Sequence, residues 1–164
     1  MAEIRELQSE DNLDDLIRLS RDFFTEYEVH HSDFFDIDTL RDEDIADFFC
    51  RSIDCDNNRT FIAIEDDEIV GYITISVRPQ PSFYKIRNVG AISGLMVHKD
   101  YRRRGIATQL LSKARTFFEK KNVNYFTVYT ATANKGATKF YKKNGMALFI
   151  SKLIGEVSKT IEET

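Results

Sequence analysis

The sequence predicts a mixed α/β domain in which helices flank a mostly antiparallel central sheet. Two amphipathic helical segments come first, three consecutive strand-like segments with short turns follow, and the later strands alternate with helices. The expected order is β-α-α-β-β-β-α-β-α-β. With 164 residues, 42% of them hydrophobic, the chain is sized for one domain with one sizeable core, and we expect that domain to span residues 1–164.

The N-terminal part is expected to hold one short strand and two helices. The strand covers residues 3–7, and the first helix, residues 12–28, carries its apolar residues on one face. The second helix covers residues 39–53. Its start at Thr39 and Asp42 resembles a capping box.

The middle of the chain changes from a helical period to a period of two. Strands are expected at residues 60–65 and 69–77, with Ile69 and Ile73 facing the same way. A third strand, residues 86–98, contains Gly90 and Gly94. Glycine inside a strand often marks a bulge, or a place where a ligand comes close to the backbone.

The C-terminal part alternates helices with strands. The clearest helix is residues 105–121, and a strand at residues 125–130 follows it. Asn134 is a suitable N-cap for a short helix that ends at Asn144-Gly145. A last strand is expected at residues 146–154, and the charged tail after it has no predicted structure.

Composition and charge narrow the function classes. A net charge of -4 argues against a general nucleic-acid binder. No apolar run reaches the ~20 residues that span a membrane. Cys50 and Cys55 have no metal-binding spacing, and without a signal peptide they indicate reduced thiols. We therefore expect a cytoplasmic protein that binds no metal, nucleic acid or membrane.

The stretch from Val97 to Thr108 links a buried strand to a strong helix. The free N–H groups and positive dipole end of a helix start form an anion site. Gly105 and Ala107 let a phosphate approach the backbone, and three consecutive arginines, Arg102 to Arg104, add positive charge. A pyrophosphate fits this combination. The alternatives are a solvated basic turn and a phosphate- or nucleic-acid-binding regulator.

This stretch resembles a known motif. The run Arg102-Arg103-Arg104-Gly105-Ile106-Ala107 is similar to the Gln/Arg-x-x-Gly-x-Gly/Ala motif of the GNAT superfamily of N-acetyltransferases. Downstream, a second family motif is resembled by Asn134, Ala137, Phe140, Tyr141 and Gly145-Met146. The resemblance covers residues 69–146. It implies an enzyme that moves an acetyl group from acetyl-CoA to a primary amine of a small molecule or peptide.

The resemblance also implies roles for individual residues. The pyrophosphate of acetyl-CoA is expected on the backbone N–H groups from Arg103 to Thr108, with the arginines screening its charge. The pantetheine arm is expected to pair with the backbone of Leu95, Met96 and Val97. Asn134 is expected to contact the cofactor arm, although an N-cap role explains it equally well.

Tyr141 is expected to donate a proton to the departing CoA sulfur. A thiolate leaving group has a pKa near ~8.5, so a positioned donor eases its departure. The alternative is a packed aromatic residue. A homodimer that pairs through the last strands is a further implication of the resemblance.

The sequence does not identify a general base. The strand segment 91–95 lacks the acid that many relatives carry there. A water held by Ser93 or by backbone carbonyls could take the role, or Glu26 and Glu28 at the end of the first helix, for which a solvated helix end is the alternative explanation. The histidines, His30, His31 and His98, are expected at the surface. The missing acid keeps a second hypothesis open, a non-catalytic domain that binds acyl-CoA as a sensor.

The segments 32–38 and 42–44 mix acids with aromatic residues. They would suit a cationic amine acceptor. Helix capping and a solvated helix face are the alternative explanation.

Overall fold

The structure, a computed structural model, describes residues 1–30, 33–34 and 36–158. Five strands form one sheet in the order β1-β2-β3-β4-β5. Neighbours pair antiparallel except β4 and β5, which are parallel. The strands are β1 (Glu3–Glu6), β2 (Asn58–Glu65), β3 (Glu68–Pro79), β4 (Asn88–Val97) and β5 (Phe126–Val128). The expected mixed class is confirmed.

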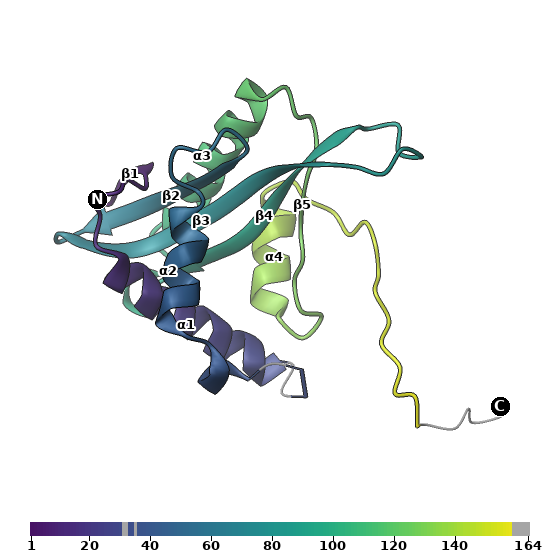
Figure 1. The fold of residues 1–164 in the computed structure, drawn as a ribbon, viewed down its shortest axis with the longest axis horizontal. Helices are drawn as coiled ribbons and strands as arrows, with labels where there is room; N and C mark the ends of the chain where they lie inside the picture. The colour runs from purple at the N-terminus through teal and green to yellow at the C-terminus, as the bar shows by residue number, and fades with distance from the viewer. Residues whose placement is uncertain (31–32, 35, 159–164) are drawn as a thin grey trace.

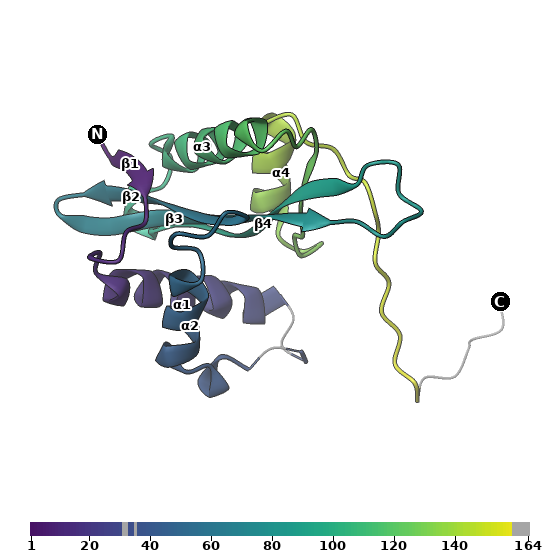
Figure 2. The same cartoon turned by 45° about the horizontal axis from the view of Figure 1, so that its top comes forward.

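Helices cover both faces of this sheet (Figures 1 and 2). One face carries α1 (Leu13–His30) and α2 (Asp42–Cys50), and the other carries α3 (Ile106–Lys120). The shorter α4 (Lys135–Lys143) lies beside β4 and β5. Two single 3₁₀ turns, η1 (Ile37–Thr39) and η2 (Lys99–Tyr101), connect longer elements. In the part of the chain that is described, no helix has both the length and the apolar character to cross a membrane.

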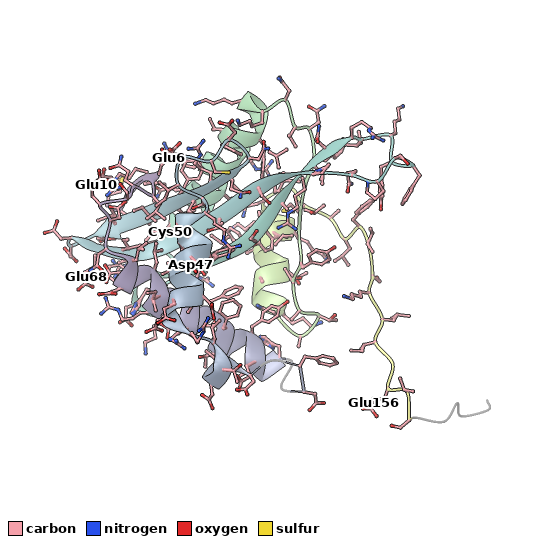
Figure 3. All side chains as sticks on the ribbon, viewed as in Figure 1. Glu6, Glu10, Asp47, Cys50, Glu68 and Glu156 are labelled. Carbon is pink, nitrogen blue, oxygen red and sulfur yellow. The ribbon has the colours of Figure 1, made fainter. Side chains whose placement is uncertain are left out.

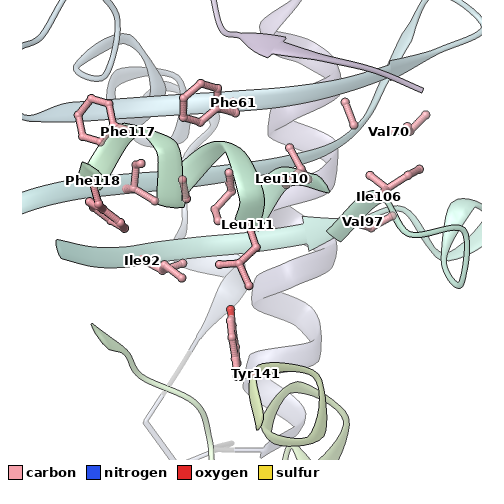
Figure 4. Packing of buried hydrophobic residues seen from close by; sticks show 14 of the residues in the cluster. Phe61, Val70, Ile92, Val97, Ile106, Leu110, Leu111, Phe117, Phe118 and Tyr141 are labelled. Atoms are coloured by element: carbon pink, nitrogen blue, oxygen red, sulfur yellow. The ribbon is translucent and has the colours of Figure 1, made fainter. Parts of the chain in front are cut away.

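Each face of the sheet has its own apolar core. The core under α3 includes Ile73, Leu110 and Phe118, together with Tyr141 from α4 (Figure 4). The core under α1 and α2 is built around Phe49 and Tyr72. The two cores hold the helices on opposite sides of β4.

The first helix is fixed to the sheet by a buried carboxylate. The side-chain oxygen of Asn12 accepts the N–H of Asp14 at 3.0 Å, which starts α1 as expected. Asp15 is buried, accepts the backbone N–H of Ile69 at 3.1 Å and pairs with Arg18. This contact sets the position of α1 over the β2–β3 turn.

Two local expectations were wrong. The second helix starts at Asp42 without a side-chain cap, because Thr39 belongs to η1 and donates its hydroxyl to the carbonyl of Asp36. Ile69 packs on the α1 face whereas Ile73 packs on the α3 face. A register shift between β2 and β3 inserts one residue between them, and one inserted residue moves a side chain to the other face.

The expected last strand is also absent from the described residues. From Ala147 to Gly155 the described chain joins no strand of the sheet, and it leads away from the sheet (Figure 1). Figure 3 shows the side chains along this segment, with Glu156 near its end. The strongly exposed apolar residues are Leu148, Phe149, Ile150, Leu153, Ile154 and Val157. A strand-like pattern forms no strand here because no neighbouring strand of the same chain pairs with it.

Candidate functional site

The edge of β4 that faces β5 is only partly paired. The parallel pairing covers Gly90 to Ile92 and ends at Val128, whereas β4 continues to Val97. In the described chain, residues 93–97 therefore have no strand on that side. Beyond Ile92 and Val128 the two strands no longer pair, and we call this unpaired stretch the gap; α4 lies beside it (Figure 1).

The free edge exposes alternate backbone groups. The N–H of His98 donates to the carbonyl of Val70 in β3 at 2.8 Å. Along an antiparallel pair the direction alternates, so the polar groups of Met96 face β3, and those of Leu95 and Val97 face the gap. Met96 therefore differs from the expectation, because its backbone is occupied within the sheet.

The gap starts at a bulge in β4. Thr74 of β3 pairs with Gly94 and Ile75 pairs with Ile92, so Ser93 is an extra residue without a partner. Its side chain is exposed. A bulge turns one side chain out of the regular alternation, and such positions are common beside active sites.

The turn after β4 leads into α3, and the start of this helix has no side-chain cap. Arg103 and Gly105 both have left-handed backbone angles, with φ of 66° and 80°. Gly105 is the N-cap of α3 and has no side chain to bond the first N–H groups; the N–H of Gln109 is the one that reaches its carbonyl, at 3.0 Å. The N–H groups of Ile106, Ala107 and Thr108 are available at the positive end of the helix dipole. This geometry suits an anion.

The three arginines of the turn have different surroundings. Arg102 donates to a carboxylate oxygen of Glu26 at 2.8 Å and to the carbonyl of Val97 at 2.9 Å, so it ties α1 to the end of β4. Arg104 lies 3.5 Å from a carboxylate oxygen of Glu65. Arg103 forms no ion pair with any described residue. Among the described residues, Arg103 is therefore the one of the three arginines whose guanidinium has no carboxylate partner.

Tyr141 of α4 is buried and packs beside Phe140, with ring centroids 5.2 Å apart. Figure 4 shows its hydroxyl pointing toward Leu111. Burial raises the pKa of the Tyr141 hydroxyl above its ordinary value, and no hydrogen bond within the described residues offsets that effect. The side chain is packed as an aromatic residue, yet its hydroxyl has no hydrogen-bond partner among the described residues.

Asn134 caps α4 as its position predicted. Its side-chain oxygen accepts the N–H of Ala137 at 3.1 Å, and its carbonyl accepts the hydroxyl of Thr138 at 3.2 Å. The helix ends at Lys143 with Asn144 as its C-cap, and Gly145 follows with a φ of 86°. The capping role of Asn134 is confirmed, and a contact with a cofactor stays a prediction for its remaining amide hydrogens.

The candidate bases have structural contacts of their own. Glu26 pairs with Arg102, and Glu28 accepts the N–H of Ile37 at 2.8 Å. The Nδ1 of His98 accepts the N–H of Asp100 at 3.2 Å, which caps η2. His31 lies outside the described residues. None of the candidates that the structure describes is identified as a base.

The acids of the α1–α2 connection also have local partners. Asp36 accepts the N–H of Asp38 at 3.0 Å, and Asp44 pairs with Arg41 at 3.0 Å. The acids border a pocket of about 230 Å³ that contains Phe24. Ser32 and Phe35 of the expected acceptor segment lie outside the described residues. The contacts that can be seen are those of caps and surface ion pairs.

A second pocket, of about 210 Å³, was missed by the sequence analysis. It lies between the end of α2 and the β3–β4 hairpin, and the bulge residue Ser93 lines it. The available signal was the run Thr74, Ser76, Arg78, which places polar side chains on one face of a strand that is otherwise buried.

Comparison with known sequences identifies relatives. Residues 13–146 match the sequence model of the acetyltransferase (GNAT) family. The chain is 30% identical over 90 residues to an uncharacterized N-acetyltransferase of Methanocaldococcus jannaschii, which is 55% of this chain and 39% of that protein's length. It is 26% identical over 131 residues to an uncharacterized N-acetyltransferase of Archaeoglobus fulgidus, covering 80% and 84% of the two chains.

Solved structures share the fold. A tetramutant of the BH1408 protein from Bacillus halodurans superposes with a TM-score of 0.80 at 19% identity, over 94% of this chain and 99% of that one. The aminoglycoside N-acetyltransferase AAC(6')-Iy, solved with CoA, gives a TM-score of 0.77 at 17% identity, over 97% and 96%. The fold agrees with the sequence match over residues 13–146, and the chain belongs to the acetyltransferase (GNAT) family.

Proposed function

We propose that the protein is an acetyl-CoA-dependent N-acetyltransferase that transfers the acetyl group to a primary amine by direct attack. One observation supports this function above the others. The unpaired edge of β4 runs from the bulge at Ser93 to the turn that starts α3, and the free Tyr141 hydroxyl comes from the helix beside that gap.

The residues along this edge fit the chemical groups of acetyl-CoA. The N–H groups of Ile106 to Thr108 and the guanidinium of Arg103 would bind the pyrophosphate, which is anionic. The outward N–H and carbonyl groups of Leu95 would bind the amide groups of the pantetheine arm, as an added strand would. Val97 offers its N–H, since its carbonyl already accepts from Arg102.

The proposed reaction balances with one proton donor from the chain. The amine nitrogen attacks the thioester carbonyl carbon, a C–N bond forms, the C–S bond breaks and its electrons go to sulfur. Tyr141 then gives its proton to the thiolate, the amine loses a proton to water, and water returns a proton to the Tyr141 oxygen, which restores the hydroxyl. A tyrosine hydroxyl with its ordinary pKa of ~10 is protonated at neutral pH, and burial raises the pKa of Tyr141 further.

The amine must reach the site in its neutral form. No carboxylate of the described chain lies on β4, and Glu26 and Glu28 are already bonded elsewhere. A water bound at Ser93 or at the β4 carbonyls would carry the proton away. The missing acid is the observation that favours the second candidate function, an acyl-CoA-binding sensor without turnover.

Calorimetric titration with acetyl-CoA and CoA, followed by a thiol-release assay with a panel of amines, separates the two functions. Binding together with thiol release for one amine class supports the transferase. Binding with no release for any amine supports the sensor. Absence of binding by either ligand refutes the assignment of the β4 edge and the α3 start.

We further propose that two copies associate through residues 146–158. This segment is extended and exposes six large apolar side chains, and the outer edge of β5 has no partner in the described chain. Pairing the segment of one copy with the β5 edge of another would satisfy both. Sedimentation analysis should give a dimer for the full chain and a monomer for a chain that ends at Met146. A monomeric full chain would contradict this arrangement.

A further inference from the structure

The pocket beside the β4 bulge lies on the α1–α2 face of the sheet. Ser52, which follows α2, forms one wall with Phe48, while Thr74 and Ser76 of β3 form the floor. Ser93 reaches it from β4 at the residue where pairing with β5 has just ended. The pocket therefore borders the part of β4 at which the acetyl group would be presented.

Two arginines make this pocket positive within a protein of net charge -4. Arg51 and Arg78 line it, and its lining contains no acid and no lysine. The Nε of Arg78 donates to the hydroxyl oxygen of Ser76 at 2.9 Å and a terminal nitrogen to that of Ser93 at 3.4 Å. Neither arginine forms an ion pair with a carboxylate of the described residues. Their remaining N–H groups are available to a ligand.

A chain of buried hydroxyls runs from the pocket floor into the protein. Ser52 donates to the carbonyl of Phe49 at 2.7 Å. Because a hydroxyl has one hydrogen, Thr60, which is 2.7 Å from Ser52, must donate to it, and Thr74 must donate to Thr60 at 2.8 Å. Thr74 thus presents only lone pairs to the pocket, and it can accept a hydrogen from an amine.

We propose that this pocket selects an acceptor that carries a carboxylate close to its amine, that is, an amino acid. The planar guanidinium fork of Arg78, with Arg51 opposite, binds the carboxylate, and Thr74 accepts from the amine. Arginine donors match carboxylate oxygens in pairs, and the two charges attract strongly in a partly enclosed site. The inference rests on the proposed acetyl transfer and adds the class of its acceptor.

The size of the pocket agrees with a small acceptor. A volume of about 210 Å³ equals roughly seven water molecules at ~30 Å³ each. That volume suits one amino acid and is less than the ~300 Å³ at which pockets for drug-sized ligands begin. A polycationic sugar would have to place its ammonium groups beside Arg51 and Arg78, which opposes binding.

The test compares acceptors that differ only in the carboxylate. Thiol release is measured for a panel of amino acids, for the carboxamide of each and for the amine without the carboxyl group, with neamine as a polycationic acceptor. The inference predicts a preference of about 10- to 100-fold in kcat/KM for an amino acid over its amide, because hydrogen bonds to charged groups are worth that much. Faster turnover of neamine or of the amides overturns the inference and leaves the transferase function standing.

Variants at the pocket supply a second, independent test. Arg78→Gln should raise the KM of the amino acid by about 10- to 100-fold, leave its kcat within about threefold, and remove the preference over the amide. Arg51→Gln should act in the same direction. Arg87→Gln is the matched control, because Arg87 is an exposed arginine of the same hairpin that does not line the pocket. An unchanged amino acid preference in Arg78→Gln overturns the inference.

Failure of the proposed function gives a different result. If the unmodified protein does not bind acetyl-CoA, the proposed transferase function is refuted. If acetyl-CoA binds but no amine is acetylated, amino acid binding to the CoA-loaded protein is measured by calorimetry. Binding that is weakened at least tenfold by Arg78→Gln supports the pocket assignment, and absence of amino acid binding overturns it. Acetyl-CoA affinity and thermal unfolding of each variant confirm that it is folded.

Discussion

Replacement of Tyr141 by phenylalanine removes one oxygen from an otherwise apolar setting. The hydroxyl has no hydrogen-bond partner in the described chain, so the substitution breaks no bond and leaves the packing against Phe140 in place. The free energy of unfolding should stay within about 0.5 kcal/mol of the original value, or increase slightly. An effect on activity could then not be attributed to a damaged fold.

The expected loss of rate follows from the two pKa values. A positioned general acid contributes about 10²- to 10⁴-fold, or about 3 to 5 kcal/mol. Because burial raises the pKa of Tyr141 while a thiol has a pKa near ~8.5, complete proton transfer is uphill, and the lower end of that range applies. We expect kcat to fall by about 100-fold, with the acetyl-CoA dissociation constant changed by less than about twofold.

Single-turnover thiol release and calorimetry measure these two quantities separately. Acetyl thioesters of more acidic thiols should recover part of the rate lost by Tyr141→Phe, because a more acidic leaving group depends less on a donor. The unmodified protein should show no decrease in kcat from Tyr141 ionisation below about pH 10. A variant with kcat within about threefold of the original, at every pH and with every thioester, would refute the assignment of Tyr141 as the acid.

Four further predictions concern the cofactor turn and the core. Gly105→Glu should abolish CoA binding, because it adds a negative charge and a side chain that disfavours the positive φ. Gly105→Asn should retain most of the CoA affinity, because asparagine tolerates that φ. Equal CoA affinity in both variants would contradict the anion site. Arg103→Gln should weaken CoA binding about three- to tenfold at low salt and less at high salt, and a salt-independent change would exclude a direct charge contact. Gly90→Ala should lower the free energy of unfolding by about 1 to 3 kcal/mol, since its Cβ would lie 2.5 Å from a ring carbon of Phe118; thermal or denaturant unfolding measures this loss. Burial raises the pKa of Tyr72 to about 12, so the folded state favours the neutral hydroxyl. The resulting contribution to the free energy of unfolding, about 3 kcal/mol, is complete below about pH 10 and should be lost as the pH rises to about 12. The stability of Tyr72→Phe should depend less on pH over that interval.

The parts of the candidate site that the sequence could predict depend on local chemistry. Asn134 bonds an N–H three residues away, and Gly105 adopts a left-handed angle at the start of the helix that follows it. Such features are encoded within one turn of a helix, so a pattern of residue types is sufficient to locate them. Their roles toward acetyl-CoA remain predictions.

The parts that the sequence could not predict depend on distant partners. The motif predicts that Arg102 binds the cofactor, but its guanidinium contacts Glu26, which is 76 positions away in the chain. Arg51 and Arg78 belong to different elements and share a pocket only because α2 packs near the β3–β4 hairpin. The segment 146–154 has the residue pattern of a strand, and a strand forms only when another edge pairs with it.

The bulge at Ser93 explains why β4 can serve both faces of the molecule. Ile92 packs under α3, whereas Met96, four residues later and expected on the same side by simple alternation, packs under α1 and α2. One inserted residue accounts for this change of face. The insertion comes directly after the last pair with β5, so the same residue marks the start of the free edge and turns its hydroxyl toward the arginine pocket. A cofactor entering between β4 and β5 and an acceptor entering from the α2 side would therefore meet at Ser93.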